Sequence, residues 1–173
     1  MQELTIQFAK DLHSVFQSNR NKLDKIGIPF FYSFPTNACQ GASVYLSLFF
    51  TWLVPEATVR VVKGSHRTLD HHHYWVELDG KVFDLTNAQF ESWLGERYPE
   101  LDSPVYAQRK HPLRNYFFYK ERESAIRAYA TFCSEHANVK NVDKAQWFVM
   151  GKLREMGWEL EQDITGGRLI KIR

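Results

Sequence analysis

Cys39 is the residue whose setting most clearly suggests chemistry, because it stands where a polar loop enters an apolar helix. Pro35-Thr36-Asn37 precedes it, and a strongly apolar segment runs from Cys39 to about Leu53. Backbone N–H groups at a helix start are unpaired and the helix dipole is positive there, so a thiolate is favoured over a thiol. The same N–H groups could face an oxyanion that develops on an attacked carbonyl. A small apolar residue with no chemical role is the alternative interpretation of this position.

A nucleophilic cysteine needs a base, and the base needs an orienting group. Two short stretches with strand character flank Asp79-Gly80, which is a strong signal for a two-residue hairpin turn. Pairing across that turn makes His73 and Asp84 diagonal neighbours on one face, where their side chains can meet. His72 points to the opposite face, and His71 lies a further pair away from Asp84. Strand parity therefore selects His73 from three consecutive histidines.

These residues lie in motifs that resemble a known superfamily. The motifs are Asn37-Ala38-Cys39-Gln40-Gly41-Ala42-Ser43, His73-Tyr74-Trp75-Val76-Glu77 and Asp84-Leu85-Thr86. The chain from about 30 to 90 resembles the transglutaminase-like branch of the papain-like cysteine hydrolases, and its segment 84–90 resembles small bacterial members. The resemblance implies Cys39 as nucleophile, His73 as base and then acid, and Asp84 as orienting partner. It also implies acyl transfer through a thioester, with water or an amine as acceptor.

The expected activity is that of a hydrolase or acyltransferase acting on an amide bond. A thiol protease, an amidase and a glutamine deamidase all stay open, and the substrate would be a peptide, a protein or a small amide. This chemistry requires no metal or organic cofactor. Asn37, Gln40 and Trp75 are candidates for the oxyanion donor or for substrate contacts. Asn37 is at least as well suited to capping the helix, and Trp75 to packing against the helix that begins at Cys39.

Two other function classes stay open. One is a binding protein that keeps the fold without activity. The other is a metal-binding protein that uses His71-His72-His73, with His66 and Asp70 nearby. Structural zinc sites normally include regularly spaced cysteines, and none lies near these histidines. Consecutive histidines on a strand also point to alternate faces, so they cannot easily reach one ion.

The element pattern predicts an α+β fold, in which a central buried helix packs on an antiparallel sheet as in a papain-like or transglutaminase-like core. The helices are expected at about 3–18 (ended by Asn19-Arg20-Asn21), 39–53, 88–98, 116–136 and 144–156 (capped by Asp143). The strands are expected at 58–63, 72–78 and 81–85, with a connection over 99–115. A terminal hairpin is expected to pair Trp158–Asp163 with Arg168–Arg173 around Thr165-Gly166-Gly167.

The length of 173 residues suits a single domain, with a core at about 25–95 and an extension at about 115–173 that could form a subdomain. Aromatic residues make up 15% and hydrophobic residues 44%, a globular composition. A net charge of +2 argues against a dedicated nucleic-acid binder. The connection carries a basic cluster, expected to be solvated although it could hold an acidic partner: Arg109, Lys110, His111 and Arg114.

Cellular location is the last expectation from the sequence. The 2 cysteines do not form a disulfide framework, which fits a reducing compartment. The N-terminus shows no secretory signal, and the longest apolar stretch, Val44 to Val54, is too short to span a bilayer. We therefore expect a cytoplasmic protein without a membrane partner, whose oligomeric state stays open.

Overall fold

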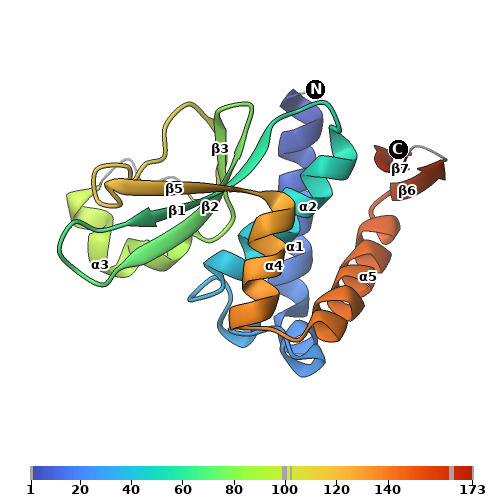
Figure 1. Cartoon of the computed structure of the whole chain (residues 1–173), viewed down its shortest axis with the longest axis horizontal. Helices are drawn as coiled ribbons and strands as arrows, with labels where there is room; N and C mark the ends of the chain where they lie inside the picture. Colours follow the sequence, from blue (N-terminus) through green and yellow to red (C-terminus); the bar gives the residue numbers. More distant parts are fainter. Residues whose placement is uncertain (1, 99–100, 102, 164–165, 173) are drawn as a thin grey trace.

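The computed structural model describes residues 2–98, 101, 103–163 and 166–172. The chain has an α+β architecture, in which an antiparallel five-stranded sheet lies beside a group of packed helices (Figure 1). The strand order in this sheet is β4-β3-β2-β1-β5, and a separate two-stranded sheet is made of β6 and β7. The predicted α+β class is confirmed at this level.

The helices α1, α2, α4 and α5 pack against one another (Figure 1). The helices are α1 (Gln2–Ile26), α2 (Cys39–Leu53), α3 (Glu91–Leu94), α4 (Ala125–Glu135) and α5 (Val139–Glu155). Short 3-10 turns lie at Phe31–Ser33, Asn87–Phe90 and Gly95–Arg97. Within the described part of the chain, none of the helices combines the length and the apolar character that a membrane span requires.

The hairpin that carries the predicted His73–Asp84 contact forms as expected. The strands of the large sheet are β1 (Val59–Ser65), β2 (His72–Leu78), β3 (Lys81–Asp84), β4 (Val105–Gln108) and β5 (Tyr119–Ser124). Across the β2–β3 turn, Leu78 pairs with Lys81 and Val76 with Phe83. Asp79 and Gly80 have φ values of 47° and 73°, the positive values that this turn requires. The predicted register is confirmed for these pairs.

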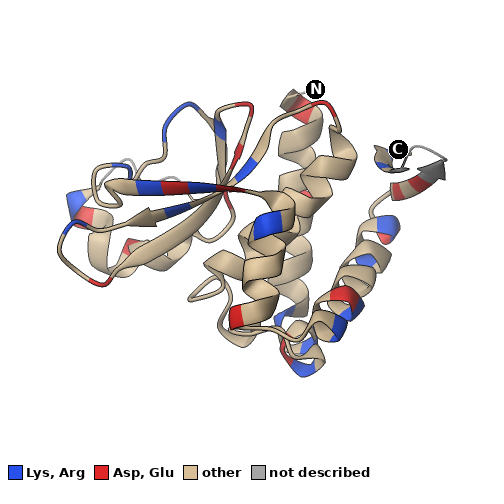
Figure 2. Ribbon diagram, viewed as in Figure 1, with Lys and Arg blue, Asp and Glu red and all other residues tan. Residues whose placement is uncertain are grey.

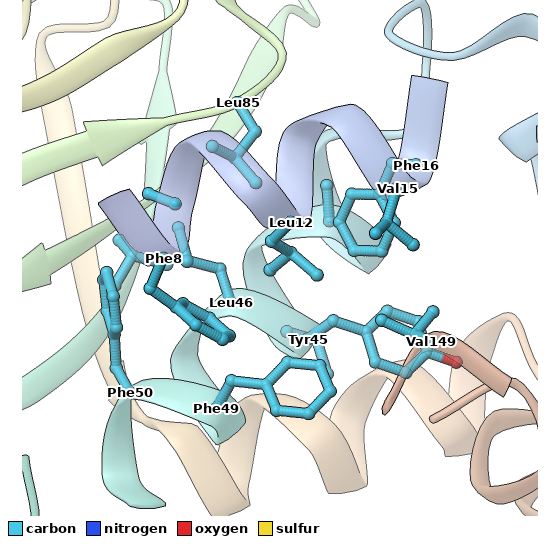
Figure 3. Close-up of a cluster of buried hydrophobic side chains, with 14 of the residues drawn as sticks. Phe8, Leu12, Val15, Phe16, Tyr45, Leu46, Phe49, Phe50, Leu85 and Val149 are labelled. Atoms are coloured by element: carbon cyan, nitrogen blue, oxygen red, sulfur yellow. The ribbon is translucent and has the colours of Figure 1, made fainter. Parts of the chain in front are cut away.

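Helix α2 is buried on nearly every side, as its composition predicts. Figure 3 shows its aromatic side chains Tyr45, Phe49 and Phe50 in one buried cluster with those of α1. The ring centroids of Phe8 and Phe49 are 5.6 Å apart, and those of Phe50 and Phe83, on β3, are 5.0 Å apart. Close packing on both sides leaves α2 little freedom to shift. It therefore holds Cys39, its first residue, in a defined place relative to β2 and β3.

Helix α1 is longer than the pattern predicts. It continues to Ile26, although Asn19 has non-helical angles (φ −119°, ψ 16°) and marks a kink. The Asn19 Nδ2 group donates to the carbonyl oxygen of Val15 at 2.9 Å, so the side chain bends the helix without ending it. Leu23 and Ile26 continue the apolar face after the kink and are buried. The predicted end near residue 18 was wrong because this second apolar segment stabilises the helix.

The segment 116–136 was predicted to be one helix, and this prediction was wrong. It contains β5, an edge strand whose Arg122 pairs with Val62 of β1, and then α4. The Ser124 hydroxyl accepts a hydrogen bond from the Arg127 amide and caps α4. Strand β4 was likewise missed within the 99–115 connection, where Gln108 pairs with Val82. Short strands such as β4 and β5 form because a neighbouring strand supplies their hydrogen bonds.

Helix α5 begins before the predicted cap. Asn138 is its cap, because its Oδ1 accepts from the Lys140 amide at 2.9 Å. Asp143 lies inside the helix and accepts a hydrogen bond from the Tyr129 hydroxyl at 2.9 Å, so its predicted capping role was wrong. The terminal hairpin is confirmed as β6 (Trp158–Asp163) and β7 (Gly166–Lys171), but Gly166 and Gly167, predicted to lie in its turn, are the first residues of β7. Thr165 and Arg173, named in that prediction, lie outside the described residues.

The two faces of the large sheet are covered by different apolar clusters. On one face, Val61, Val76 and Phe83 belong to the core that contains α1 and α2. The other face carries a second cluster, whose buried members are Val62, Trp75, Val82, Phe90, Leu94, Val105, Leu113, Tyr116 and Phe117. The connection between β4 and β5 contributes to this second cluster. His73 and Asp84 share the strand face of Trp75, so this connection covers the predicted site.

Gly64 on β1 permits the close packing of this second cluster. A Cβ atom at this position would lie 2.5 Å from two ring carbons of Trp75 and 2.8 Å from Cβ of Phe117. We expect Gly64→Ala to lower the free energy of unfolding by about 1–3 kcal/mol, because overpacking forces its neighbours to shift. Chemical denaturation followed by circular dichroism measures this change.

Gly151→Ala provides the control, because nothing lies within 4 Å of a Cβ atom built at Gly151, which is an exposed position of α5. It should leave stability unchanged or raise it by up to about 1 kcal/mol. A Gly64→Ala variant as stable as the original chain would contradict the described packing of Trp75 against β1.

Candidate active site

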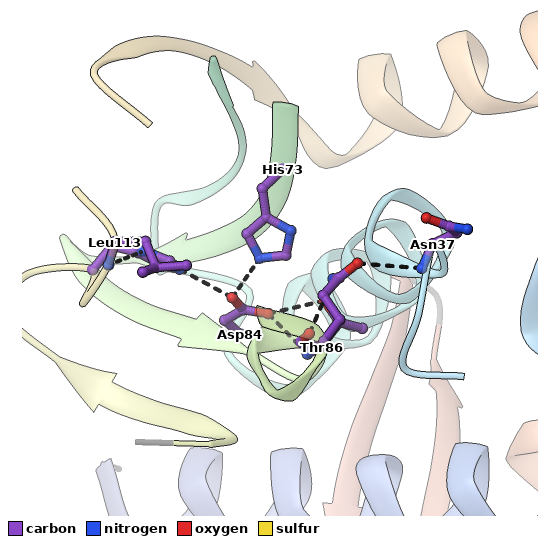
Figure 4. A network of polar contacts seen from close by, with 7 residues as sticks. Asn37, His73, Asp84, Thr86 and Leu113 are labelled. Carbon is purple, nitrogen blue, oxygen red and sulfur yellow. Dashed lines mark hydrogen bonds and ion pairs between the residues drawn. The ribbon is translucent and has the colours of Figure 1, made fainter. Parts of the chain in front are cut away.

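His73 and Asp84 form the buried pair at the centre of the site. The Nε2 atom of His73 lies 2.6 Å from Oδ2 of Asp84, and both side chains have an exposed fraction of 0% (Figure 4). The two residues come from adjacent strands and share one face of the hairpin. This is the contact that strand parity predicts, and it is confirmed.

Asp84 is held by four hydrogen bonds. Its Oδ1 accepts from the amide of Thr86 at 2.8 Å and from the Thr86 hydroxyl at 3.0 Å. Its Oδ2 accepts from His73 and also from Nε2 of His111 at 3.0 Å. Burial by itself raises the pKa of this carboxyl, but the charge of His73 and the hydrogen bonds from both histidines hold it well below its usual range. Asp84 is therefore a fixed carboxylate.

His73 is held as an imidazolium by this carboxylate. Burial opposes protonation, but the charge and hydrogen bond of Asp84, followed by the interaction with the Cys39 side chain, raise the pKa of His73 to about 10. Its second ring nitrogen, Nδ1, is buried and has no hydrogen-bond partner. In Figure 4 this nitrogen points away from Asp84, to the side on which Asn37 lies. A proton can therefore be exchanged at Nδ1 while Nε2 stays bound to Asp84.

Cys39 lies on the wall of a pocket of about 660 Å³. Its exposed fraction is 9%, and it is the first residue of α2. Cys39 is outside the buried cluster of His73, Asp84 and His111, whose nitrogen and oxygen atoms lie within 4.8 Å of one another. The Cys39 side chain is the smallest of the influences that raise the pKa of His73, after those of Asp84.

The start of α2 has no side-chain cap, so the suggested capping role of Asn37 was wrong. Ala38 is the N-cap residue and makes no side-chain hydrogen bond. Asn37 has a φ of 61°, and its backbone amide donates to Oε1 of Gln89 at 3.2 Å. The first amides of α2 are therefore not occupied by a capping side chain, and an anion beside Cys39 would meet them.

The remaining predicted site residues divide between two places. Asn37 and Gln40 line the pocket together with Cys39. Trp75 does not line it, and its exposed fraction is 0%. The Trp75 ring stacks on His111 with 4.3 Å between ring centroids, within the second apolar cluster. The suggested roles of Trp75 as a substrate contact and as a packing partner of α2 were therefore both wrong, because its strand face turns away from the main core.

His111 is the site residue that sequence reasoning missed. It was expected on a solvated connection, but only 2% of it is exposed. Its Nδ1 accepts from the Leu113 amide at 3.1 Å, so in the neutral ring the proton is on Nε2, which donates to Asp84. Burial lowers the pKa of His111, against the opposing effect of Asp84, and favours this neutral form. The only signal in the sequence was the apolar character of the residues that follow, Leu113, Tyr116 and Phe117.

Metal binding was the alternative use of the histidines. The proposed set around His71-His72-His73 is not assembled, since Nδ1 of His66 accepts from the Thr68 amide and Nδ1 of His71 is bonded to the Tyr116 hydroxyl. Among the described residues, the group that could hold a metal is His73, Asp84 and His111. Metal-bound histidines normally donate their other N–H group to an acceptor. Because Nδ1 of His111 accepts a backbone hydrogen bond, this cluster suits an oriented carboxylate better than a metal.

Comparison with known proteins gave no match. No protein-family model matches the chain, and no similar protein was found among curated proteins or among solved structures. The chemistry open to the site follows from its own groups. A thiol at a helix start and an imidazole bound to a buried carboxylate are the components of nucleophilic catalysis by cysteine.

Proposed function

We propose that this protein is a cysteine-dependent hydrolase or acyltransferase that acts on an amide bond. Cys39 is the nucleophile, His73 the base and then the acid, and Asp84 the orienting group. One observation carries the proposal: the buried His73 is bound to Asp84 through Nε2, its Nδ1 is unpaired, and Cys39 contributes to its raised pKa. A papain-like or transglutaminase-like core is part of the proposal, supported by the arrangement of a central helix on an antiparallel sheet.

The first step is attack by the Cys39 sulfur on the carbonyl carbon of the amide. An imidazolium beside a thiol favours the thiolate, which is the attacking form. The negative charge that develops on the carbonyl oxygen is stabilised by the free amides at the start of α2, with Asn37 and Gln40 as neighbouring donors. The proton on Nδ1 of His73 passes to the nitrogen of the leaving amine as the C–N bond breaks. A thioester on Cys39 and a neutral His73 remain.

The second step releases the acyl group. Water or an amine attacks the thioester carbon, and His73 takes up the proton that this nucleophile loses. The C–S bond breaks, and the thiolate and imidazolium are restored. Asp84 keeps its charge throughout and stabilises the imidazolium, since four hydrogen bonds hold its carboxylate in place.

The lining of the Cys39 pocket favours a substrate that carries an apolar, uncharged or cationic group next to the reacting amide. Aromatic side chains form much of the wall: Phe30, Tyr74, Phe90, Trp93, Phe117 and Phe132. Among the described lining residues, Asp70 is the one carboxylate and there is no lysine or arginine. An acidic substrate would therefore find no full positive charge here apart from protonated histidine. Peptides or amides with an apolar or aromatic acyl group fit this lining best.

Selective alkylation tests the proposed nucleophile. At pH 6.5 an ordinary thiol is almost entirely protonated, so we expect iodoacetamide to modify Cys39 at least about ten times faster than Cys133. Burial, the largest cause, raises the pKa of the Cys133 thiol, which further slows its reaction. Mass spectrometry of tryptic peptides over time measures both rates in one sample.

The control is Cys39→Ala, which should fold with unchanged stability and lose only the fast phase of labelling. Equal rates at the two cysteines would contradict an activated Cys39. That result would favour a binding protein that keeps the fold without catalysis.

A further inference from the structure

A second pocket, of about 360 Å³, lies over the sheet face that carries Trp75 and Val82. Its wall is rich in positive charge: Arg109, Lys110, Arg114, Lys120 and Arg122. Figure 2 shows Lys and Arg on β5 and on the loop that precedes it. Glu77 is the one acidic side chain among the described lining residues. This pocket shares no lining residue with the pocket of Cys39.

Most of this positive charge is not neutralised by the protein. Glu77 binds Arg122 through two hydrogen bonds of 2.8 and 3.0 Å. The ion pairs among the described residues give no carboxylate partner to the other four cations of the wall. Lys120 instead donates to the carbonyl oxygens of Arg114 and Phe118 at 3.3 and 3.1 Å. These contacts orient the ammonium group but leave its charge uncompensated.

The charges on this wall also repel one another. Partial burial, and then the nearby Arg122 and Arg114, lower the pKa of Lys120, while Glu77 opposes them. An anion bound among these side chains would relieve the repulsion. Arginine is suited to this role, since its planar guanidinium can bind two oxygens of one phosphate group at once.

Trp75 supplies a second, independent sign of a ligand. Its side chain is fully buried and lines this pocket, and its indole Nε1 has no hydrogen-bond partner. An indole N–H can only donate, so a buried one is normally paired. The far edge of the six-membered ring packs against Gly64 on β1. An acceptor that enters the pocket beside this ring could satisfy the unpaired N–H group.

We propose that this pocket binds the phosphate group of a small anionic ligand. The cations Arg109, Lys110, Arg114 and Lys120 provide the charge, and Nε1 of Trp75 provides a directed hydrogen bond. Phosphate matches this set because it carries up to two negative charges and several acceptor oxygens. His111 lines this pocket and also donates to Asp84, but the proposal does not depend on the acyl-transfer chemistry.

Inorganic phosphate is the probe that tests this site. The ¹⁵N-labelled protein is titrated with phosphate at constant ionic strength, and the indole N–H resonances are followed by NMR. We expect a saturable shift of the Trp75 resonance, which is identified by its loss in Trp75→Phe. The indole signals of Trp147 and Trp93, which lie outside this pocket, should not move.

Charge-removing variants locate the binding. Arg114→Gln and Lys120→Gln should each weaken phosphate binding about ten-fold, because each removes a charged partner of the anion. The matched control is Lys144→Gln, an exposed cation on α5 outside this pocket, which should leave affinity within two-fold. Thermal unfolding of each variant without phosphate shows that it is folded.

Three results would overturn the proposal. The first is the absence of a saturable response of the Trp75 resonance. The second is an equal loss of affinity in Lys144→Gln and Lys120→Gln, which would show nonspecific charge attraction. The third is tight binding of a single-stranded oligonucleotide without a saturable response to phosphate, which would assign the basic wall to nucleic acid.

Discussion

Asp84→Ala should lower the free energy of unfolding by about 3–5 kcal/mol, the usual effect of removing one partner from a buried ion pair. The change leaves a buried imidazolium at His73 without its counter-charge. It also removes the acceptor for His111 and Thr86, which are buried as well. Urea denaturation at pH 6 measures the loss, because the pair is fully formed at that pH.

The pH dependence of the free energy of unfolding tests whether the His73–Asp84 pair is the cause of this loss. The pKa of His73 is raised from 6.5 to about 10, so its contribution is complete below pH 6.5 and is lost as the pH rises to about 10. The pKa of Asp84 is lowered, so its contribution is present above pH 3.8 and is lost as the pH falls further. The pKa of His111 is lowered, so its contribution is lost as the pH falls below 6.5. We expect the original chain to lose stability above pH 6.5 with a slope of up to about 1.4 kcal/mol per pH unit.

Asp84→Asn should flatten this slope, because its amide cannot hold a proton on His73. Asp24→Asn is the matched control, since Asp24 is an exposed carboxylate on α1. Its effect should stay within about 0.5 kcal/mol at every pH. A slope above pH 6.5 that is the same in Asp84→Asn and in the original chain would show that His73 is not held as an imidazolium.

His73→Gln should slow the alkylation of Cys39 by about a hundred-fold at neutral pH, the lower part of the range for loss of a general base. Glutamine can still donate a hydrogen bond to Asp84, so the variant keeps a partner for the buried carboxylate. It cannot carry a proton to or from the thiol. The rate of Cys39 labelling by iodoacetamide, compared with that of Cys133 in the same sample, gives the effect.

The matched control for this experiment is His72→Gln. His72 is exposed and directly precedes His73 on β2, and it lines the same pocket as Cys39. Burial, and then the charge of Lys63, lower the pKa of His72, so at neutral pH it carries no charge that would favour a thiolate. We expect its loss to change the labelling rate by less than about three-fold. The opposite pattern, with a large effect at His72 only, would show that His72, and not His73, is the base.

The local sequence was sufficient to predict the hairpin and the central helix. The Asp79-Gly80 turn and strict side-chain alternation determine which residues share a strand face, so the His73–Asp84 contact could be derived without a structure. Helix α2 could be predicted because its apolar residues lie on every side, which is typical of a buried helix. Both features depend on neighbours within a few residues, or across one tight turn.

The tertiary structure alone decided what surrounds this pair. His111 lies 27 positions after Asp84 in the chain, and only the folding of the β4–β5 connection over the second face of the sheet brings them together. The same folding encloses Trp75 and forms the basic pocket, while β5 exists because β1 supplies its hydrogen bonds. Such contacts depend on how distant segments close over one another. No local periodicity encodes that closure, since its free energy is gained only when the whole core is packed.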